Sequence, residues 1–210
     1  MSTAEGSVID AADEGAVAAA AAVLASGGTV LLPTDTVYGV AALPVLPGAT
    51  RQLFELKDRN SAQPIAVLVA DIDQALELVE DPSEAVARWM ATLWPGPLTL
   101  VLPRSAEARS MDLGGEADTI GVRCPDHPFV RALAAEVGPI ATTSANRSGE
   151  PTPTSAAEAA AALVGEVDLV VDGGPAGTLA SSVVDASLAT WQLLREGAVS
   201  AEQLHAAAQG

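Results

Sequence analysis

The sequence predicts a single α/β domain, in which a twisted, open, mixed sheet is flanked by helices. Three observations favour this fold class. Short apolar runs typical of buried strands alternate with amphipathic helical stretches along the whole chain. Several of these runs follow one another without a helix between them, so the order departs from a regular βαβ repeat. The 210 residues, of which 49% are hydrophobic, are enough for one sizeable core.

The expected helices are recognised by apolar residues at helical spacing and by the residues that end them. Between residues 72 and 93, apolar side chains fall twice at i, i+3, i+4 and i+7, and Trp94-Pro95-Gly96-Pro97 ends the second stretch. Gly27-Gly28 ends the first helix. In chain order, the expected helices cover residues 13–26, 49–56, 72–79, 86–93, 129–137 and 154–163.

The expected strands are the short apolar runs between these helices. Residues 65–69 are apolar at every position, as in a sheet that is covered on both faces. We expect a flexible start over residues 1–12, the domain over residues 13–200 and a C-terminal helix or tail over residues 201–210. In chain order, the expected strands cover residues 29–33, 37–42, 65–69, 98–102, 119–123, 139–142, 167–171, 182–185 and 193–195.

The charge and the cysteine content exclude several classes of function. With 10 Lys+Arg against 27 Asp+Glu, the net charge of -17 argues against a generic nucleic-acid binder. One cysteine and two histidines allow neither an internal disulfide nor a structural zinc site, and we expect no metal site in the protein itself. No apolar run is long enough to span a membrane, and residues 1–5 lack a basic signal region. A cytoplasmic protein is expected.

The single lysine of the chain lies in Lys57-Asp58-Arg59, just after an expected helix. A lysine point charge and an arginine fork two residues apart are suited to holding phosphate oxygens. The alternative is a solvated pair of cations that complements the dipole at the helix end. On spacing alone, this alternative is favoured.

Four further polar segments follow expected strands, where open α/β sheets bind ligands. Each segment also has a simpler structural explanation. In the order in which the segments are named below, these are a hydroxyl turn, a buried ion pair of Arg123, a surface loop and a glycine turn. Neither a Walker A motif, a Gly-x-Ser-x-Gly elbow nor a His-Glu-x-x-His motif is present. The residues alone predict a partly cationic pocket for an anionic ligand. The segments are Pro33-Thr34-Asp35-Thr36-Val37-Tyr38-Gly39, Gly121-Val122-Arg123, Thr142-Thr143-Ser144-Ala145-Asn146-Arg147-Ser148-Gly149 and Asp172-Gly173-Gly174-Pro175-Ala176-Gly177-Thr178.

Taken in order, Lys57-x-Arg59 and the first three of these segments resemble the YrdC/Sua5 family, and within it the short, TsaC-like threonylcarbamoyl-AMP synthases. Trp94-Pro95-Gly96-Pro97-Leu98-Thr99 and Ser182-Val183-Val184-Asp185 complete the match, which extends to Gly197. Asn60 stands where family members usually have proline. Longer members carry an extra C-terminal domain, for which we expect no room here. The resemblance implies the family fold, a twisted open sheet with a concave, positively charged face.

The resemblance also implies a reaction. L-threonine and bicarbonate or CO2 form a carbamate, which attacks the α-phosphate of ATP, with Mg2+, to give threonylcarbamoyl-AMP and pyrophosphate. The product serves the t6A modification of tRNA, so transferase proteins of that pathway are expected downstream. Two alternatives stay open: an RNA-binding or ribosome-maturation module, and a YciO-like paralogue with another substrate. The few basic residues outside the motifs argue against direct RNA binding.

By the same resemblance, the candidate residues divide between the two substrates. Lys57 and Arg59 are implied as the catalytic cations, which hold the phosphates and stabilise the departing pyrophosphate. We therefore expect a Lys57→Ala variant to lose turnover but to keep its fold. The implied ATP-binding residues are Lys57, Arg59, Thr119, Thr142, Asn146 and Arg195, and the implied threonine-binding residues are Thr34, Arg123, Ser144 and Ser182.

Overall fold

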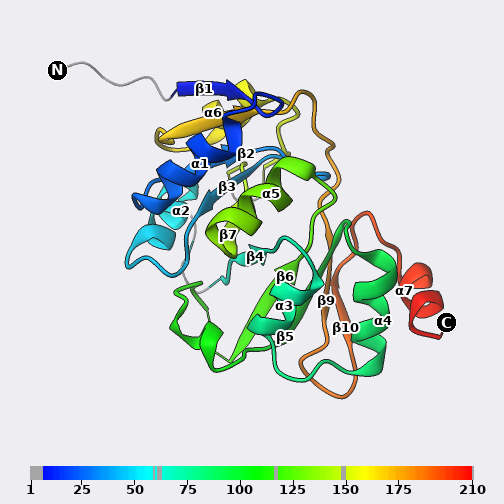
Figure 1. The fold of residues 1–210 in the computed structure, drawn as a ribbon. Helices are drawn as coiled ribbons and strands as arrows, with labels where there is room; N and C mark the ends of the chain where they lie inside the picture. Colours follow the sequence, from blue (N-terminus) through cyan, green and yellow to red (C-terminus); the bar gives the residue numbers. More distant parts are fainter. Residues whose placement is uncertain (1–6, 59, 61–62, 116–117, 148–149, 210) are drawn as a thin grey trace.

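A computed structural model describes residues 7–58, 60, 63–115, 118–147 and 150–209 of the chain. Within these residues, ten strands form one sheet in the order β1-β8-β2-β3-β7-β4-β6-β5-β9-β10, and helices pack against it (Figure 1). Four neighbouring pairs of strands are parallel and five are antiparallel. The predicted α/β fold with an open mixed sheet is confirmed.

The strands follow the expected runs closely. Two of them, β6 (Thr119–Arg123) and β9 (Ser182–Asp185), have the predicted bounds. The other strands that were expected are β2 (Val30–Leu32), β3 (Gly39–Ala42), β4 (Ala66–Leu68), β5 (Leu98–Pro103), β7 (Ile140–Ser144), β8 (Leu169–Asp172) and β10 (Gln192–Arg195).

The expected helices are present, with bounds that differ by a few residues. Gly27, with a φ of 83°, follows the first of them in the left-handed region that glycine tolerates. A short 3-10 helix, η1 (Glu107–Ser110), lies in the polar loop after β5. The α-helices are α1 (Ala16–Ala25), α2 (Ala49–Lys57), α3 (Ile72–Leu78), α4 (Glu84–Leu93), α5 (Pro128–Val137), α6 (Ala156–Ala162) and α7 (Ala201–Gln209).

The chain start departs from the expectation. Residues 1–12 were expected to be flexible, and for residues 7–10 this prediction is wrong, because β1 (Ser7–Asp10) pairs in parallel with β8. Most of β1 is exposed, so no alternation of buried and exposed residues marks it in the sequence. The strand is defined by the sheet edge that β8 offers, which is a tertiary feature.

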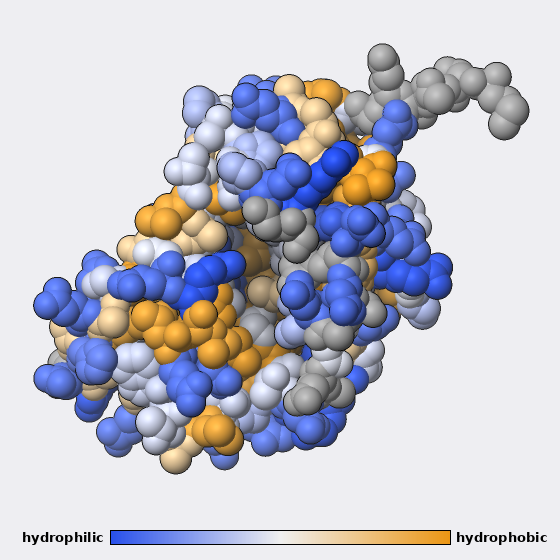
Figure 2. Space-filling view, turned by 180° about the vertical axis from the view of Figure 1, so that it is seen from behind, coloured by the Kyte–Doolittle hydropathy of each residue, from blue (hydrophilic) through white to orange (hydrophobic). Residues whose placement is uncertain are grey.

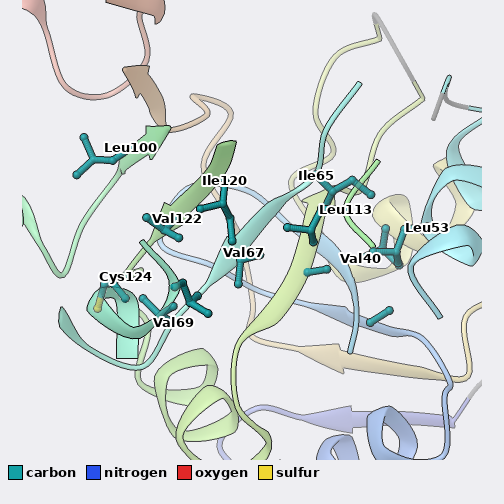
Figure 3. Packing of buried hydrophobic residues seen from close by; sticks show 14 of the residues in the cluster. Val40, Leu53, Ile65, Val67, Val69, Leu100, Leu113, Ile120, Val122 and Cys124 are labelled. Carbon is teal, nitrogen blue, oxygen red and sulfur yellow. The ribbon is translucent and has the colours of Figure 1, made fainter. Parts of the chain in front are cut away.

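Two apolar clusters hold the layers together. Residues of α1 and α5 pack with one set of residues from β2, β3, β7 and β8. Residues of α2, α3, α4 and α6 pack with the alternate set, as the period of two in a strand requires. In Figure 3, Val40, Leu53, Ile65 and Leu113 of this larger cluster lie close together. No α-helix in the described part of the chain has the length and apolar content that a membrane crossing requires.

The last helix is anchored to the body of the domain. Trp89 in α4 donates from its indole nitrogen to the carbonyl of Leu204 in α7, at 2.8 Å. Trp191 packs edge-on between Trp89 and His205, with ring centroids 5.4 and 4.8 Å away. The expected C-terminal helix is therefore a packed part of the fold, and Leu204 is fully buried.

Candidate functional site

A cavity of about 320 Å³ lies on one face of the sheet, over the central strands β7, β4, β6, β5 and β9. Figure 2 shows that the molecule is hollowed on this side, with hydrophobic surface beside the hollow. Among the described residues that line the cavity, the charged ones are all arginines: Arg104, Arg123 and Arg195. No aspartate or glutamate from the described chain joins them, although the protein has 27 acidic residues. The cavity therefore suits an anionic ligand.

The side chains of each strand point alternately to the two faces of the sheet, and those on one face form the floor of this cavity. In β5, Leu100 and Leu102 belong to the core, whereas Thr99 and Val101 line the cavity. The alternation is similar in β6, where Thr119, Gly121 and Arg123 line the cavity and Val122 belongs to the core, although Ile120 contributes to both. The polar cavity face and the apolar core face thus come from the same short strands.

Gly121 has no side chain, which leaves space in the middle of the cavity floor. A Cβ at this position would meet Ala66 and Thr99 side chains at 3.5 and 3.6 Å, which are ordinary contacts. We expect Gly121→Val to raise the KM for the ligand about tenfold by filling the cavity, while the free energy of unfolding changes by less than about 1 kcal/mol. Steady-state kinetics and thermal melts, with Gly121→Ala as the milder control, test this. Unchanged KM values in both variants would place the ligand elsewhere.

Lys57, the last residue of α2, is buried and only 3% exposed. Its ammonium donates to Thr143 Oγ1, Ser144 O, Ser144 Oγ and Asn146 Oδ1 at 2.5 to 3.3 Å. The solvated alternative for this lysine is therefore wrong. The expectation that its replacement spares the fold is not supported either, because the ammonium joins α2 to the segment after β7. Ser144 lines the cavity, whereas Lys57 and Asn146 are not among its lining residues and reach it through their contacts with Ser144.

Arg123, at the end of β6, is fixed by three sets of partners. Its Nε donates to Gly96 O at 3.1 Å, its Nη1 to Thr36 Oγ1 at 2.9 Å and its Nη2 to Asp35 Oδ1 at 2.5 Å. Both side chains of the ion pair are buried, at 7% and 12% exposure. Burial lowers the pKa of Arg123, and the charge of Asp35 opposes this shift. The buried ion pair expected as the alternative is thus present, and Arg123 also lines the cavity.

Arg195, in β10, is the second cation of the site. Its Nε donates to Ser181 O at 3.0 Å and its Nη2 to Ser181 Oγ at 3.2 Å. The Ser181 hydroxyl also lies 2.9 Å from Thr99 Oγ1. Burial lowers the pKa of Arg195, and the nearby charge of Arg123 lowers it further. An anion bound between the guanidinium groups of Arg123 and Arg195 would favour their charged forms. It would thus offset both the effect of burial and the repulsion between the two cations.

Ser182 has a different environment from its neighbour. It is fully buried, its hydroxyl donates to Val199 O at 2.6 Å, and it accepts from the amides of Gly197 and Val199. The structure does not bring Ser182 into the cavity lining, whereas Ser181 is part of it. The sequence reasoning chose the wrong serine of the pair for a position at the cavity, because it lacked the loop that binds the Ser182 hydroxyl.

The two serines make a matched test of this difference. We expect Ser182→Ala to lower the free energy of unfolding by about 1–3 kcal/mol, because two buried amides lose their acceptor, with little change in the KM for the ligand. Ser181→Ala is expected to raise the KM for the ligand, with little change in the free energy of unfolding. Chemical denaturation and steady-state kinetics on both variants measure this. A raised KM in Ser182→Ala alone would return that serine to the ligand.

The remaining predicted residues fall into three groups. Thr34, Thr119 and Thr142 line the cavity, as predicted for ligand-contacting residues. The Thr34 hydroxyl also donates to Val37 O at 2.6 Å and accepts from two amides, so the expected hydroxyl turn is present as well. Asn146 accepts a hydrogen bond from the Lys57 ammonium and donates one to Glu150 O. Arg59, the second predicted catalytic cation, lies outside the described residues.

Sequence reasoning did not choose several described residues of the cavity lining as site residues, among them Thr99, Arg104, Gly121 and Ser181. The alternation around Thr119 and Arg123 was a signal for Gly121, which lies between them on the same face. The same period marks Thr99 between Leu98 and Leu100. Arg104 had no comparable signal, because it follows β5 at the start of a polar loop.

Comparisons with known proteins relate the chain to one family. The model of the Sua5/YciO/YrdC family, described as "Telomere recombination", matches residues 22–197. A threonylcarbamoyl-AMP synthase of Bacillus subtilis is 40% identical over 192 residues, which cover 90% of this chain and 56% of that protein. A putative threonylcarbamoyl-AMP synthase of Mycobacterium tuberculosis H37Rv is 38% identical over 189 residues, covering 90% of this chain and 87% of the relative.

A solved structure gives the same result at the level of the fold. The crystal structure of Pyrococcus abyssi Sua5 complexed with L-threonine superimposes with a TM-score of 0.82 at 33% identity. The match covers 91% of this chain and 56% of that one, so the chain spans about half the length of these longer relatives. The motifs, the fold and the family match agree, and the chain belongs to the Sua5/YciO/YrdC family.

Proposed function

We propose that the protein is an L-threonylcarbamoyladenylate synthase, which forms threonylcarbamoyl-AMP and pyrophosphate from L-threonine, bicarbonate or CO2, and ATP. The observation that carries this proposal is the cavity wall, which among the described residues holds three arginines and several hydroxyls but no carboxylate. Such a wall suits a ligand that carries phosphates and a carboxylate. The relatives named as threonylcarbamoyl-AMP synthases supply the specific reaction.

In the proposed reaction, the threonine amine forms a carbamate, either with bicarbonate and loss of water or with CO2 and loss of a proton from the nitrogen, and a carbamate oxygen then attacks the α-phosphorus of ATP. The bond to the β-phosphate oxygen breaks, and pyrophosphate leaves with the electron pair. Ser144, backed by the buried ammonium of Lys57, is suited to the phosphate side, where negative charge develops on the departing group. Arg123 is suited to the threonine carboxylate, with the hydroxyls of Thr34 and Ser181 on its polar groups.

We assign Thr119, Thr142 and Arg195 to the nucleotide, and Asn146 to the support of the phosphate-binding segment. Arg59 keeps its proposed role on the phosphates by resemblance alone. Mg2+ is proposed to arrive with ATP, coordinated mainly by phosphate oxygens and water, as this ion prefers.

Binding of extended RNA is not favoured as the main function. Three surface arginines, Arg51, Arg88 and Arg109, are already paired with carboxylates. Such pairing leaves little unbalanced positive charge outside the cavity for a phosphate backbone. We propose instead that the product passes to transferase proteins of tRNA t6A synthesis, and that the protein acts in the cytoplasm, where those substrates occur.

The test is an incubation of the purified chain with ATP, bicarbonate and radiolabelled L-threonine. We expect pyrophosphate release that requires threonine and bicarbonate, together with a labelled adenylate of matching amount. L-serine, which lacks one methyl group, is the matched control and is expected to react more slowly. Release that is independent of threonine, or equally fast with serine, would contradict the proposal and favour a paralogue with another substrate.

A further inference from the structure

Arg104 is a buried cation that the roles above do not use. It follows β5, is only 2% exposed and lines the cavity. Its Nε donates to Thr119 O at 2.7 Å and its Nη1 to Met111 O at 3.1 Å. Within the described chain, no hydrogen bond is formed by Nη2 and no carboxylate lies within ion-pair distance of the guanidinium. The group is therefore held by neutral main-chain oxygens, with one nitrogen left over.

The surroundings show that nearby acids are directed elsewhere. Asp118 pairs with Arg109 at 3.5 Å, and Glu80 contacts the same exposed arginine. Burial lowers the pKa of Arg104, which the charge of Asp112 opposes and that of Arg109 reinforces. Burying a guanidinium without a partner charge is unfavourable. A neutral donor would serve the two carbonyls equally well, so the retained charge and the spare nitrogen point to a ligand.

The strand order indicates which part of a ligand reaches Arg104. Strands β7, β4, β6 and β5 are adjacent, so three strand spacings, about 14 Å, separate the Ser144 wall from the end of β5. That span is comparable to an extended nucleoside triphosphate. Arg104 contacts Thr119, and the cavity lining also includes the apolar side chains of Pro64, Ile65 and Ile120. Apolar walls with a single donor suit the face and edge of a base or ribose better than a phosphate.

We propose that Arg104 binds the nucleoside end of the nucleotide, with Nη2 donating to an acceptor atom of the base or ribose. Thr119 O and Met111 O hold the guanidinium plane in place, so the donor is preorganised before the ligand arrives. This assignment rests on the proposed function, because it takes the phosphates to lie at the Ser144 side. It adds a nucleotide-binding residue to the opposite wall.

The test measures binding of ATP, adenosine and inorganic tripolyphosphate to the full chain by calorimetry. Arg104→Met removes the charge and the donor, and Arg104→Lys keeps a charge without the fork. Arg109→Gln, in the same loop but paired at the surface, is the matched control. We expect both Arg104 variants to bind ATP and adenosine about tenfold more weakly and tripolyphosphate unchanged, because one hydrogen bond to a charged group is lost. Arg109→Gln is expected to bind all three like the wild type.

Other results would overturn the proposal. Equal weakening for tripolyphosphate would place Arg104 on the phosphates, and unchanged ATP binding with a lower melting temperature would make it a loop anchor only. If Arg104→Met does not fold, the same comparison is made with Arg104→Lys alone. Wild-type protein that binds neither ATP nor tripolyphosphate would refute the proposed function. If the wild type binds both, the role of Arg104 is tested independently of the proposed function.

Discussion

Replacing Lys57 with methionine is expected to reduce both turnover and stability. The substitution keeps the length of the side chain but removes the ammonium, so the partly buried oxygens of Ser144 and Asn146 lose this donor. We expect turnover to fall about 100-fold, as when one preorganised donor is lost from a site of developing negative charge. The free energy of unfolding should fall by about 3 kcal/mol. Pyrophosphate release and urea denaturation measure the two effects.

Arg51→Gln is the matched control for this variant. Arg51 lies on the same helix, its side chain is 75% exposed, and among the described residues its ion-pair partner is Glu55. Its replacement should leave turnover unchanged and alter the free energy of unfolding by less than about 0.5 kcal/mol. If Lys57→Met retained full turnover, the charge behind the Ser144 segment would have no role in the reaction.

Replacing Arg123 with glutamine is expected to lower the free energy of unfolding by about 3–5 kcal/mol. The change breaks a buried ion pair and leaves the Asp35 carboxylate without its counterion. It also removes the guanidinium proposed to bind the threonine carboxylate, so the KM for L-threonine should rise about tenfold or more. Denaturation curves and threonine titrations at saturating ATP provide the two measurements.

A double variant separates the structural part of Arg123 from its part in binding. Adding Asp35→Asn to Arg123→Gln removes the stranded charge, so part of the lost stability should return. The KM for threonine should stay high, because no guanidinium is restored. Recovery of both stability and KM in the double variant would show that Arg123 acts only through its ion pair, and would remove it from the threonine site.

Much of the fold was predictable because local patterns and the final structure agree. The runs at residues 119–123 and 182–185 became β6 and β9 with the same bounds, since each is a short apolar segment between clear breaks. The helical spacing in residues 72–79 and 86–93 likewise became α3 and α4. The strand β1 was missed because it depends on the free edge of β8, which is far away in the sequence.

The candidate site was less predictable, since its residues come from distant segments. Lys57 and Asn146 are 89 residues apart, and only the family resemblance placed them together. The burial of Lys57 and its contacts with Ser144 and Asn146 follow from the packing of α2 against β7, which the sequence does not encode locally. The choice between Ser181 and Ser182 depends on a hydroxyl bonded to residues 197–199. No local pattern distinguishes two adjacent serines.

Residue order alone was sufficient for the α/β class, the mixed sheet and the motifs of the family, because these follow from hydrophobic periodicity and from short polar segments at strand ends. The identity of the groups at the cavity wall required the assembled sheet. Strand register and loop contacts determine that Arg123 pairs with Asp35, that Arg195 binds Ser181 and that Arg104 lines the opposite wall. The direction of a side chain depends on its neighbours in space, and a buried charge is stabilised only by groups that the fold brings to it.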